Sequence, residues 1–144
     1  MVPGTDDYCE FCYQVKKAAE GEYITEMFGW DEKVQRELFD REWQDIRQDV
    51  VLYRDNPIGT ISVSEDNEDT IIRLFFILPE YQNRGIGSYL LDNILSKMDE
   101  IGRVAKLKLL KNNPVKSLYL RHGFSIIDED KYHYHTERKP VNRI

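Results

Sequence analysis

One region of the chain reads as a strand, a helix and a second strand in immediate succession, and it limits the possible folds more than any other feature. Residues 71–78 are nearly continuous apolar sequence, which is typical of a central strand covered on both faces. From about residue 87 to 101, apolar residues recur every three or four positions, as in an amphipathic helix. Residues 104–110 then alternate lysine with leucine, as a strand does. This order predicts a right-handed parallel crossover within one sheet.

Helices and antiparallel strands are predicted around this crossover. The expected helices lie at residues 8–20, 31–43 and 115–122, and the expected strands at residues 49–53, 58–64, 124–128 and 132–137. Gly21 and Gly29 mark a connection between the first two helices, and Val34, Leu38 and Trp43 are expected on the apolar side of the second helix. No repeat or linker interrupts the chain, so residues 1–144 are expected to form a single domain.

The balance of charge and apolarity narrows the class of protein. The 144 residues carry a formal net charge of −6, whereas a protein that binds the nucleic-acid backbone usually presents a basic face. No apolar run is long enough to cross a bilayer, and the first residues lack the basic and apolar regions of a signal peptide. We therefore expect a cytoplasmic protein that binds neither nucleic acid nor a membrane.

The segment after the apolar strand has the composition of an anion-binding loop. A glycine-containing turn opens the long helix, so its backbone N–H groups point the same way as the unpaired N–H groups of the first helical turn. Gly85 and Gly87 lack side chains that would keep a phosphate away from this backbone. The loop predicts a phosphate site, although a glycine turn that binds no ligand has the same pattern.

Two common nucleotide-binding loops do not match this segment. The mononucleotide loop requires Lys and then Ser or Thr after its glycines, but Ser88 and Tyr89 follow Gly87. The dinucleotide fingerprint requires a third glycine, and Leu90 occupies that position. The remaining spacing is Gln or Arg, two residues, Gly, one residue, and Gly or Ala, and residues 82–87 meet it.

A second motif follows the strand at residues 104–110. Within residues 110–124, an Asn after the strand precedes a short helix that carries Leu-Tyr, and Gly-Phe comes next. In this order, the two motifs resemble those of the GNAT family of N-acetyltransferases, over about residues 50–138. The resemblance implies a mixed α/β domain with a mostly antiparallel central sheet and one parallel βαβ crossover. The family opens with a strand, but the few residues before the first helix are not strand-like, so we expect that strand to be absent or truncated.

The resemblance implies transfer of an acetyl group from acetyl-CoA to a primary amine, on a small molecule or a peptide, by a monomer or homodimer. The alternative is an inactive module of the same fold that binds or senses acyl-CoA. By resemblance, residues 76–78 would line the pantetheine, Asn113 would bond its amides, and Tyr119 would protonate the departing thiolate as a general acid. The cofactor-binding residues implied in this way are Phe76, Ile77, Leu78, Gln82, Asn83, Arg84, Gly85, Ile86, Gly87, Ser88, Asn113, Ser117 and Tyr119.

The resemblance does not identify the general base. Family members often place a carboxylate on the strand before the loop, but residues 71–77 contain none. Glu22 and Glu26 lie between the first two predicted helices, in a segment that commonly borders the acceptor pocket of the family. They are our candidates for the base or for contacts to a cationic amine. The alternative is that they are ordinary charges flanking the helices, with a base that acts through water.

Two further patterns suggest redox or metal chemistry but have simpler explanations. Cys9 and Cys12 have the spacing of a redox or zinc half-site, yet no second Cys/His pair accompanies them. We expect two thiols one turn apart on a helix. His133 and His135 share one face of a predicted strand, but no third ligand has a useful spacing. We therefore expect no metal.

Overall fold

The computed structural model describes residues 1–141, and the chain forms two compact units. The first unit comprises residues 1–62 and 74–82, and the second unit comprises residues 63–73 and the chain from Asn83 onwards. The units interleave along the sequence, so neither is a contiguous segment. That residues 1–144 act as a single domain stays a prediction.

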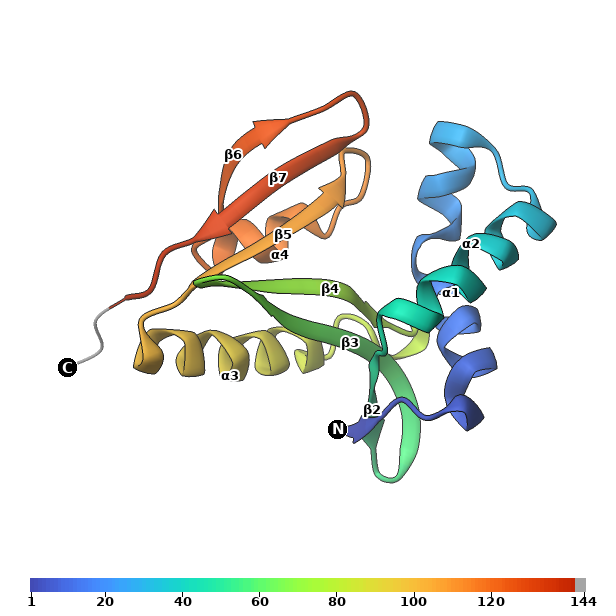
Figure 1. Ribbon diagram of the computed structural model, residues 1–144, viewed down its shortest axis with the longest axis horizontal. Coiled ribbons are helices and arrows are strands. Elements are labelled where there is room, and N and C mark those ends of the chain that lie inside the picture. Colours follow the sequence, from blue (N-terminus) through green and yellow to red (C-terminus); the bar gives the residue numbers. More distant parts are fainter. Residues whose placement is uncertain (142–144) are drawn as a thin grey trace. The chain divides into compact units, whose positions relative to one another are not determined.

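The strands belong to one seven-stranded sheet in the order β1-β2-β3-β4-β5-β7-β6 (Figure 1). Their bounds are Val2–Pro3 (β1), Asp49–Tyr53 (β2), Asn56–Asp66 (β3), Asp69–Ile77 (β4), Val104–Leu110 (β5), Ser125–Glu129 (β6) and His133–Arg138 (β7). β4 and β5 are parallel, with Thr70 opposite Ala105. The pairs β1–β2, β2–β3, β5–β7 and β6–β7 are antiparallel. The expected mixed α/β fold, with a mostly antiparallel sheet and one parallel crossover, is confirmed.

The expectation that the first strand is absent is wrong. β1 is two residues long and pairs antiparallel with β2, with Val2 opposite Val50 and Pro3 opposite Asp49. Proline cannot donate to a ladder and is tolerated at the edge of a sheet, where β1 lies. A strand this short that contains proline gives no alternating pattern, and this is why the sequence did not reveal it.

The first helix is longer than expected. α1 runs over Cys9–Phe28, so the segment that begins at Gly21 is helical rather than a connection. Gly21 lies against the indole of Trp30, where a Cβ atom would be 3.7 Å from the ring. The helix ends at Gly29, whose φ of 76° only glycine adopts readily. The 3-10 turn η1 (Asp6–Tyr8) precedes α1.

The second helix, α2 (Glu32–Asp45), does not bury the side that the sequence predicted. Val34 and Leu38 are each 47% exposed, whereas Phe39 and Trp43 are buried. Phe39 and Trp43 are four residues apart and therefore share one face of the helix. The apolar side of α2 is thus set by the two aromatic residues, of which the sequence predicted only Trp43.

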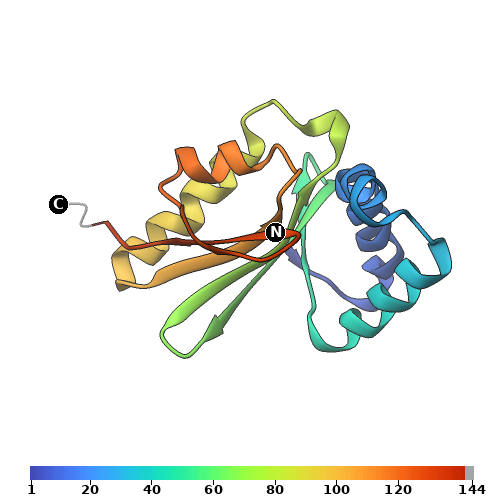
Figure 2. The same ribbon diagram turned by 90° about the horizontal axis from the view of Figure 1, so that it is seen from above.

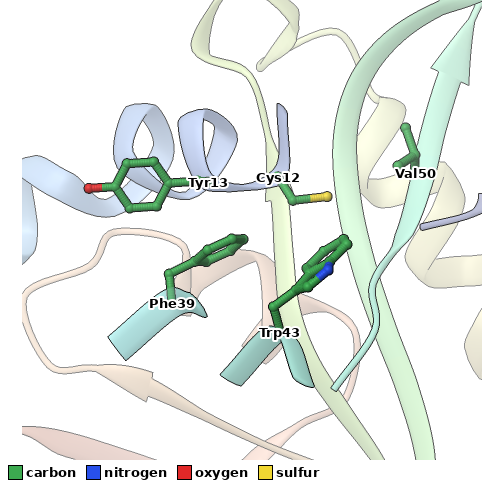
Figure 3. Close-up of a cluster of buried hydrophobic side chains, with 5 residues drawn as sticks. All are labelled: Cys12, Tyr13, Phe39, Trp43 and Val50. Atoms are coloured by element: carbon green, nitrogen blue, oxygen red, sulfur yellow. The ribbon is translucent and has the colours of Figure 1, made fainter. Parts of the chain in front are cut away.

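Figure 3 shows the buried cluster of the first unit. Phe39 and Trp43 of α2 pack with Cys12 and Tyr13 of α1 and with Val50 of β2. The rings of Phe39 and Trp43 are stacked with centroids 5.8 Å apart, and Tyr13 meets Phe39 edge-on at 5.3 Å. Burial raises the pKa of the Cys12 thiol to about 12, so this group packs rather than reacts. Both cysteines are free thiols on α1, as expected.

The second unit contains α3 (Ile86–Ile101) and α4 (Lys116–Arg121) together with β5, β7 and β6. The two helices lie together on one side of these strands (Figure 2). α3 ends at Gly102, which has a φ of 69°. None of the helices within residues 1–141 combines the length and the apolarity that a membrane span requires.

Candidate functional site

The loop that opens α3 contains two residues in the left-handed region. Asn83 has a φ of 61°, and Gly85, the N-cap of α3, has a φ of 80°. No side chain caps the first turn of α3, and no acidic residue lies in it. A Cβ atom on Gly85 would meet nothing within 4 Å. With no capping side chain and no acidic residue, the first N–H groups of α3 and the positive end of its dipole have the character of an anion site.

Gln82 forms hydrogen bonds with the residues that precede this loop. Its Nε2 donates to the carbonyl oxygen of Ile77 at 2.8 Å, and its backbone N–H donates to the carbonyl of Pro79 at 3.1 Å. The second bond closes the 3-10 turn η2 (Pro79–Tyr81) that follows β4. The side-chain amide of Gln82 thus holds the end of β4, while its predicted contact with the cofactor stays a prediction.

The end of β4 presents its backbone groups in two directions. The N–H of Leu78 donates to the carbonyl of Ile58 in β3 at 2.8 Å. The carbonyl oxygen of Phe76 also faces β3, because it lies 2.4 Å from the position of a Cβ atom built on Gly59. Successive residues of a strand use opposite edges. The backbone of Ile77 therefore points away from β3. Its carbonyl oxygen accepts from Gln82, so another extended chain could bond on this side through the N–H of Ile77.

Leu74 adopts an unusual backbone conformation within β4. Its φ is 55°, a region that costs a non-glycine residue about 1–2 kcal/mol. Its carbonyl oxygen accepts a hydrogen bond from Oγ1 of Thr60 at 3.0 Å, and this bond helps to hold the conformation. Such strain is concentrated at functional sites. Nothing in the apolar run around Leu74 signals it in the sequence.

Asn113 and Ser117 belong to the turn that starts α4. Oδ1 of Asn113 accepts from the backbone N–H of Val115 at 3.0 Å, which leaves its amide NH₂ as the group able to donate to a ligand. Oγ of the exposed Ser117 donates to the carbonyl of Pro114 at 3.2 Å. Both side chains therefore stabilise the turn, and their contacts with a cofactor remain predictions.

Tyr119 is buried on α4, with 6% of its surface exposed. Its ring meets Phe124 edge-on, with the centroids 5.6 Å apart. Burial raises the pKa of the Tyr119 phenol well above its usual range. The hydroxyl therefore stays protonated at neutral pH and can donate a hydrogen bond to a developing anion.

The candidate acidic residues of the first unit differ in their environments. Glu22 and Glu26 are exposed on α1. Asp31 caps α2, with Oδ1 accepting from the N–H of Val34 at 3.1 Å. Glu32, at the start of α2, accepts hydrogen bonds from three side chains, two of which belong to α1. Its donors are Lys17, Trp30 and Tyr13.

Glu20 was not among the residues selected from the sequence. It lies on α1, and burial raises its pKa, an effect that Lys16 opposes and Glu42 reinforces. A carboxylate with a raised pKa is better suited to accept a proton near neutral pH than an exposed one. No sequence signal distinguishes Glu20 from the other charges of α1, because its burial depends on tertiary packing.

His133 and His135 share one acceptor rather than a metal ion. Nδ1 of His133 lies 3.3 Å from Oδ1 of Asp130, and Nε2 of His135 lies 3.0 Å from Oδ2 of the same carboxylate. These contacts hold the turn between β6 and β7 and lower the pKa of Asp130. Among residues 1–141, no group of three or more His, Cys, Asp or Glu side chains could hold a metal ion.

The predicted site residues fall into both units of the chain. The first unit holds Glu22, Glu26, Phe76, Ile77, Leu78 and Gln82, and the second unit holds Asn83, Arg84, Gly85, Ile86, Gly87, Ser88, Asn113, Ser117 and Tyr119. In the second unit, a side-chain contact joins the first turn of α3 to the residue that follows α4, the helix that carries Tyr119. It runs from Oγ of Ser88 to Nε2 of His122, over 3.0 Å. The sequence did not single out His122, because its role depends on this contact.

Among the described strands, β4 and β5 form the parallel pair, and α3, which connects them, starts without a capping side chain. Residues 46–126 match the family model described as the acetyltransferase (GNAT) domain. The chain belongs to the GNAT acetyltransferase family, and the resemblance found in its motifs is confirmed. No curated protein matches the sequence.

Solved structures of acetyltransferases share this fold. The PaiA N-acetyltransferase of Thermoplasma acidophilum, in complex with coenzyme A, is 19% identical, with 92% of this chain and 93% of that chain covered and a TM-score of 0.74. An acetyltransferase from Thermus thermophilus is 19% identical over 96% of this chain and 94% of its own, with a TM-score of 0.72. A protein from Pyrococcus horikoshii is 18% identical over 95% of this chain and 93% of its own, with a TM-score of 0.74. Identities this low show the fold alone.

Proposed function

We propose that this protein transfers an acetyl group from acetyl-CoA to a primary amine. The observation that carries the proposal is the loop before α3, where Asn83 and Gly85 are left-handed and the first helical turn has no capping side chain. Acetyl-CoA carries a pyrophosphate, and converging backbone N–H groups at a helix N-terminus suit such an anion. Membership of the GNAT family supports this donor, as does the coenzyme A bound to the PaiA N-acetyltransferase.

The end of β4 is the segment to which the family resemblance assigns the pantetheine. Of residues 76–78, Ile77 is the one whose backbone points away from β3, because the backbones of Phe76 and Leu78 are directed to that strand. We assign the main-chain contact with the pantetheine to Ile77 and give Phe76 and Leu78 a role through their side chains.

In the proposed reaction a neutral amine attacks the carbonyl carbon of the thioester. The new C–N bond forms, the C–S bond breaks, and the amine proton passes to a base while the CoA thiolate leaves. Because burial raises its pKa, the Tyr119 phenol is a poor proton donor to a free thiolate but a good hydrogen-bond donor. We assign Tyr119 to a hydrogen bond that stabilises the negative charge developing on sulfur, and in this role the phenol keeps its proton.

Glu22 and Glu26 remain our candidates for the base or for contacts with a cationic acceptor, since both are exposed on α1. The second candidate function is an acyl-CoA-binding module without catalysis. Its specific support is that residues 71–77, the part of β4 that precedes the loop, contain no carboxylate.

Binding of acetyl-CoA is tested by calorimetry on the wild type and two matched glycine variants. Gly85→Glu places a negative charge where the pyrophosphate would bind, and we expect it to abolish binding. Gly102→Glu is the control: it also has a positive φ and open space around a Cβ atom, but it lies at the other end of α3. Both glycines have a positive φ, so both variants carry backbone strain, and a loss of binding in both would point to the fold rather than to the loop.

Catalysis is tested by the release of free CoA thiol across a panel of primary amines. Thiol release that depends on one amine supports the transferase. Binding of acetyl-CoA with no release for any amine favours the binding module. No binding to the wild type contradicts the acyl-CoA site itself.

A further inference from the structure

A histidine that the sequence motifs do not specify lies against the first turn of α3. His122 directly follows α4, and its side chain is 12% exposed. Its Nδ1 lies 2.7 Å from the carbonyl oxygen of Leu118. Its Nε2 lies 3.0 Å from Oγ of Ser88 and 3.2 Å from Oδ1 of Asp92. Ser88 belongs to the loop and helix start proposed to bind pyrophosphate.

These contacts determine where the protons of the ring lie. A carbonyl oxygen can only accept, so Nδ1 must carry a proton and donate to Leu118. When the imidazole is neutral, Nε2 is therefore an acceptor and the Ser88 hydroxyl donates to it. When the imidazole is protonated, Nε2 becomes a donor toward the carboxylate of Asp92. The hydroxyl proton of Ser88 is then free for another acceptor.

The same residue types form the catalytic triads of hydrolases, but the geometry here differs. In a triad, the carboxylate and the nucleophile contact opposite nitrogens of the ring. Ser88 and Asp92 both approach Nε2, and a backbone carbonyl occupies Nδ1. The ring is therefore not oriented to activate Ser88 as a nucleophile.

We propose that His122 is a positioning residue that couples binding of the cofactor pyrophosphate at the start of α3 to uptake of a proton. The inference rests on the proposed function, because it takes the bound anion to be that pyrophosphate. An anion beside Ser88 attracts the imidazolium and accepts the hydroxyl proton that only the imidazolium releases. Cofactor affinity therefore rises when the pH is lowered and the imidazole takes up its proton.

The other charged groups near His122 do not replace Asp92 in this role. Arg138 of β7 donates from Nε to the backbone carbonyl of His122 at 3.1 Å, and its guanidinium pairs with Asp99 of α3. Arg121 precedes His122 on α4 and is exposed. Arg138 and Asp99 neutralise each other, which leaves Asp92 as the charged side chain that contacts the ring.

The test measures proton uptake directly, by calorimetry in buffers of different ionisation enthalpy. The ligand is coenzyme A without its 3′-phosphate, because a phosphate monoester titrates near pH 6 and would add its own protons. For the wild type we expect net proton uptake near pH 7 and a Kd about two- to fivefold lower at about pH 5.5 than at about pH 8. His122→Gln keeps an acceptor for Ser88 but cannot titrate, so uptake and pH dependence should vanish.

The chain contains three histidines, so the other two supply the control. His133→Gln combined with His135→Gln should bind with the same proton uptake as the wild type. Equal uptake in the wild type and in His122→Gln overturns the inference and leaves the proposed function standing. If the wild type binds neither this ligand nor acetyl-CoA, both the inference and the proposed function are overturned.

Two further variants, at Ser88 and Asp92, test the role of His122 even if His122→Gln fails to fold. Ser88→Ala removes the hydroxyl relay and should reduce the proton uptake. Asp92→Asn removes the carboxylate, whose side chain is 64% exposed, and should shift the rise in affinity to lower pH. A pH profile of Kd that is unchanged in both variants contradicts the role of His122.

Discussion

The guanidinium of Arg138 donates two hydrogen bonds to the carboxylate of Asp99, over 2.8 and 3.1 Å. The side chains are only 5% and 2% exposed, respectively. This bidentate pair joins β7 to the last turn of α3. The same arginine also bonds the carbonyl of His122. One buried ion pair thus ties together the helix of the proposed anion site and the end of the helix that carries Tyr119.

Removing one partner of this pair should destabilise the second unit. Asp99→Asn leaves the Arg138 charge buried without its counter-ion, and such losses typically cost about 3–5 kcal/mol. The pair formed by Lys106 and Asp69 in the same unit is more exposed, at 39% and 32%, so Lys106→Met should cost less than about 1 kcal/mol. Urea denaturation of the two variants measures the difference. Equal losses would show that burial does not set the strength of the Arg138–Asp99 pair.

Replacing Tyr119 by Phe should lower turnover and leave affinity for the donor almost unchanged. The ring packs against Phe124, a contact that phenylalanine preserves, so the fold should survive. Loss of the hydroxyl removes a hydrogen bond to the leaving thiolate, and such groups commonly contribute about 10²-fold or more to the rate. Steady-state kinetics with acetyl-CoA and a productive amine measure kcat and KM. Tyr89→Phe, at a tyrosine that is 67% exposed on α3, is the control. An unchanged kcat in Tyr119→Phe removes this residue from the reaction.

The sequence predicted the elements whose pattern is local and missed what depends on tertiary contacts. The strand Val104–Leu110 was predicted to the residue, because alternation and a flanking glycine define it. Gly21 was wrongly predicted to end a helix, since its packing against Trp30 outweighs its low helix propensity. The prediction of which side of α2 is buried was also wrong, because Val34 and Leu38 fit helical spacing as well as Phe39 does.

The features of the candidate site also divide into those that the sequence predicted and those that it did not. Glycine spacing was sufficient to predict the loop before α3, whose left-handed Gly85 requires that residue type. The sequence does not predict the positive φ of Leu74, because a leucine at this position also suits an ordinary strand. The contacts of His122 with Ser88 and Asp92 join residues more than one element apart. Only the folded chain brings them together.

The Glu32 carboxylate should make the first unit sensitive to acid. Hydrogen bonds from Lys17, Trp30 and Tyr13 lower its pKa from an ordinary 4.5 to about 2. A lowered pKa in the folded state means that the stabilisation is complete above pH 4.5 and is lost as the pH falls toward 2. Glu32→Gln should therefore flatten the dependence of Tm on pH in this window. Glu22→Gln, at an exposed glutamate of α1, should leave the dependence as in the wild type. A wild-type slope in Glu32→Gln would contradict the assignment.

Two buried glycines of the first unit should respond to alanine in opposite directions. A Cβ atom on Gly59 would lie 2.4 Å from the carbonyl oxygen of Phe76 and 2.8 Å from Cδ1 of Ile77, and a backbone atom cannot move aside without disturbing β4. Gly59→Ala should therefore destabilise the protein by about 1–3 kcal/mol. At Gly21 the nearest atom is 3.7 Å away, an ordinary contact, and the position is helical. Gly21→Ala should stabilise the protein by up to about 1 kcal/mol.

Urea denaturation of both alanine variants measures these changes in the free energy of unfolding. Gly59→Ala should also weaken acetyl-CoA binding, because the strand it displaces carries the backbone of Ile77 that we assign to the pantetheine. Gly21→Ala lies on α1 and should bind acetyl-CoA as the wild type does. A Gly59→Ala protein that is destabilised yet binds normally would remove the main-chain contact of Ile77 from the proposed site. Normal stability in that variant would instead show that β3 and β4 separate at Gly59 more easily than a 2.4 Å approach to backbone allows.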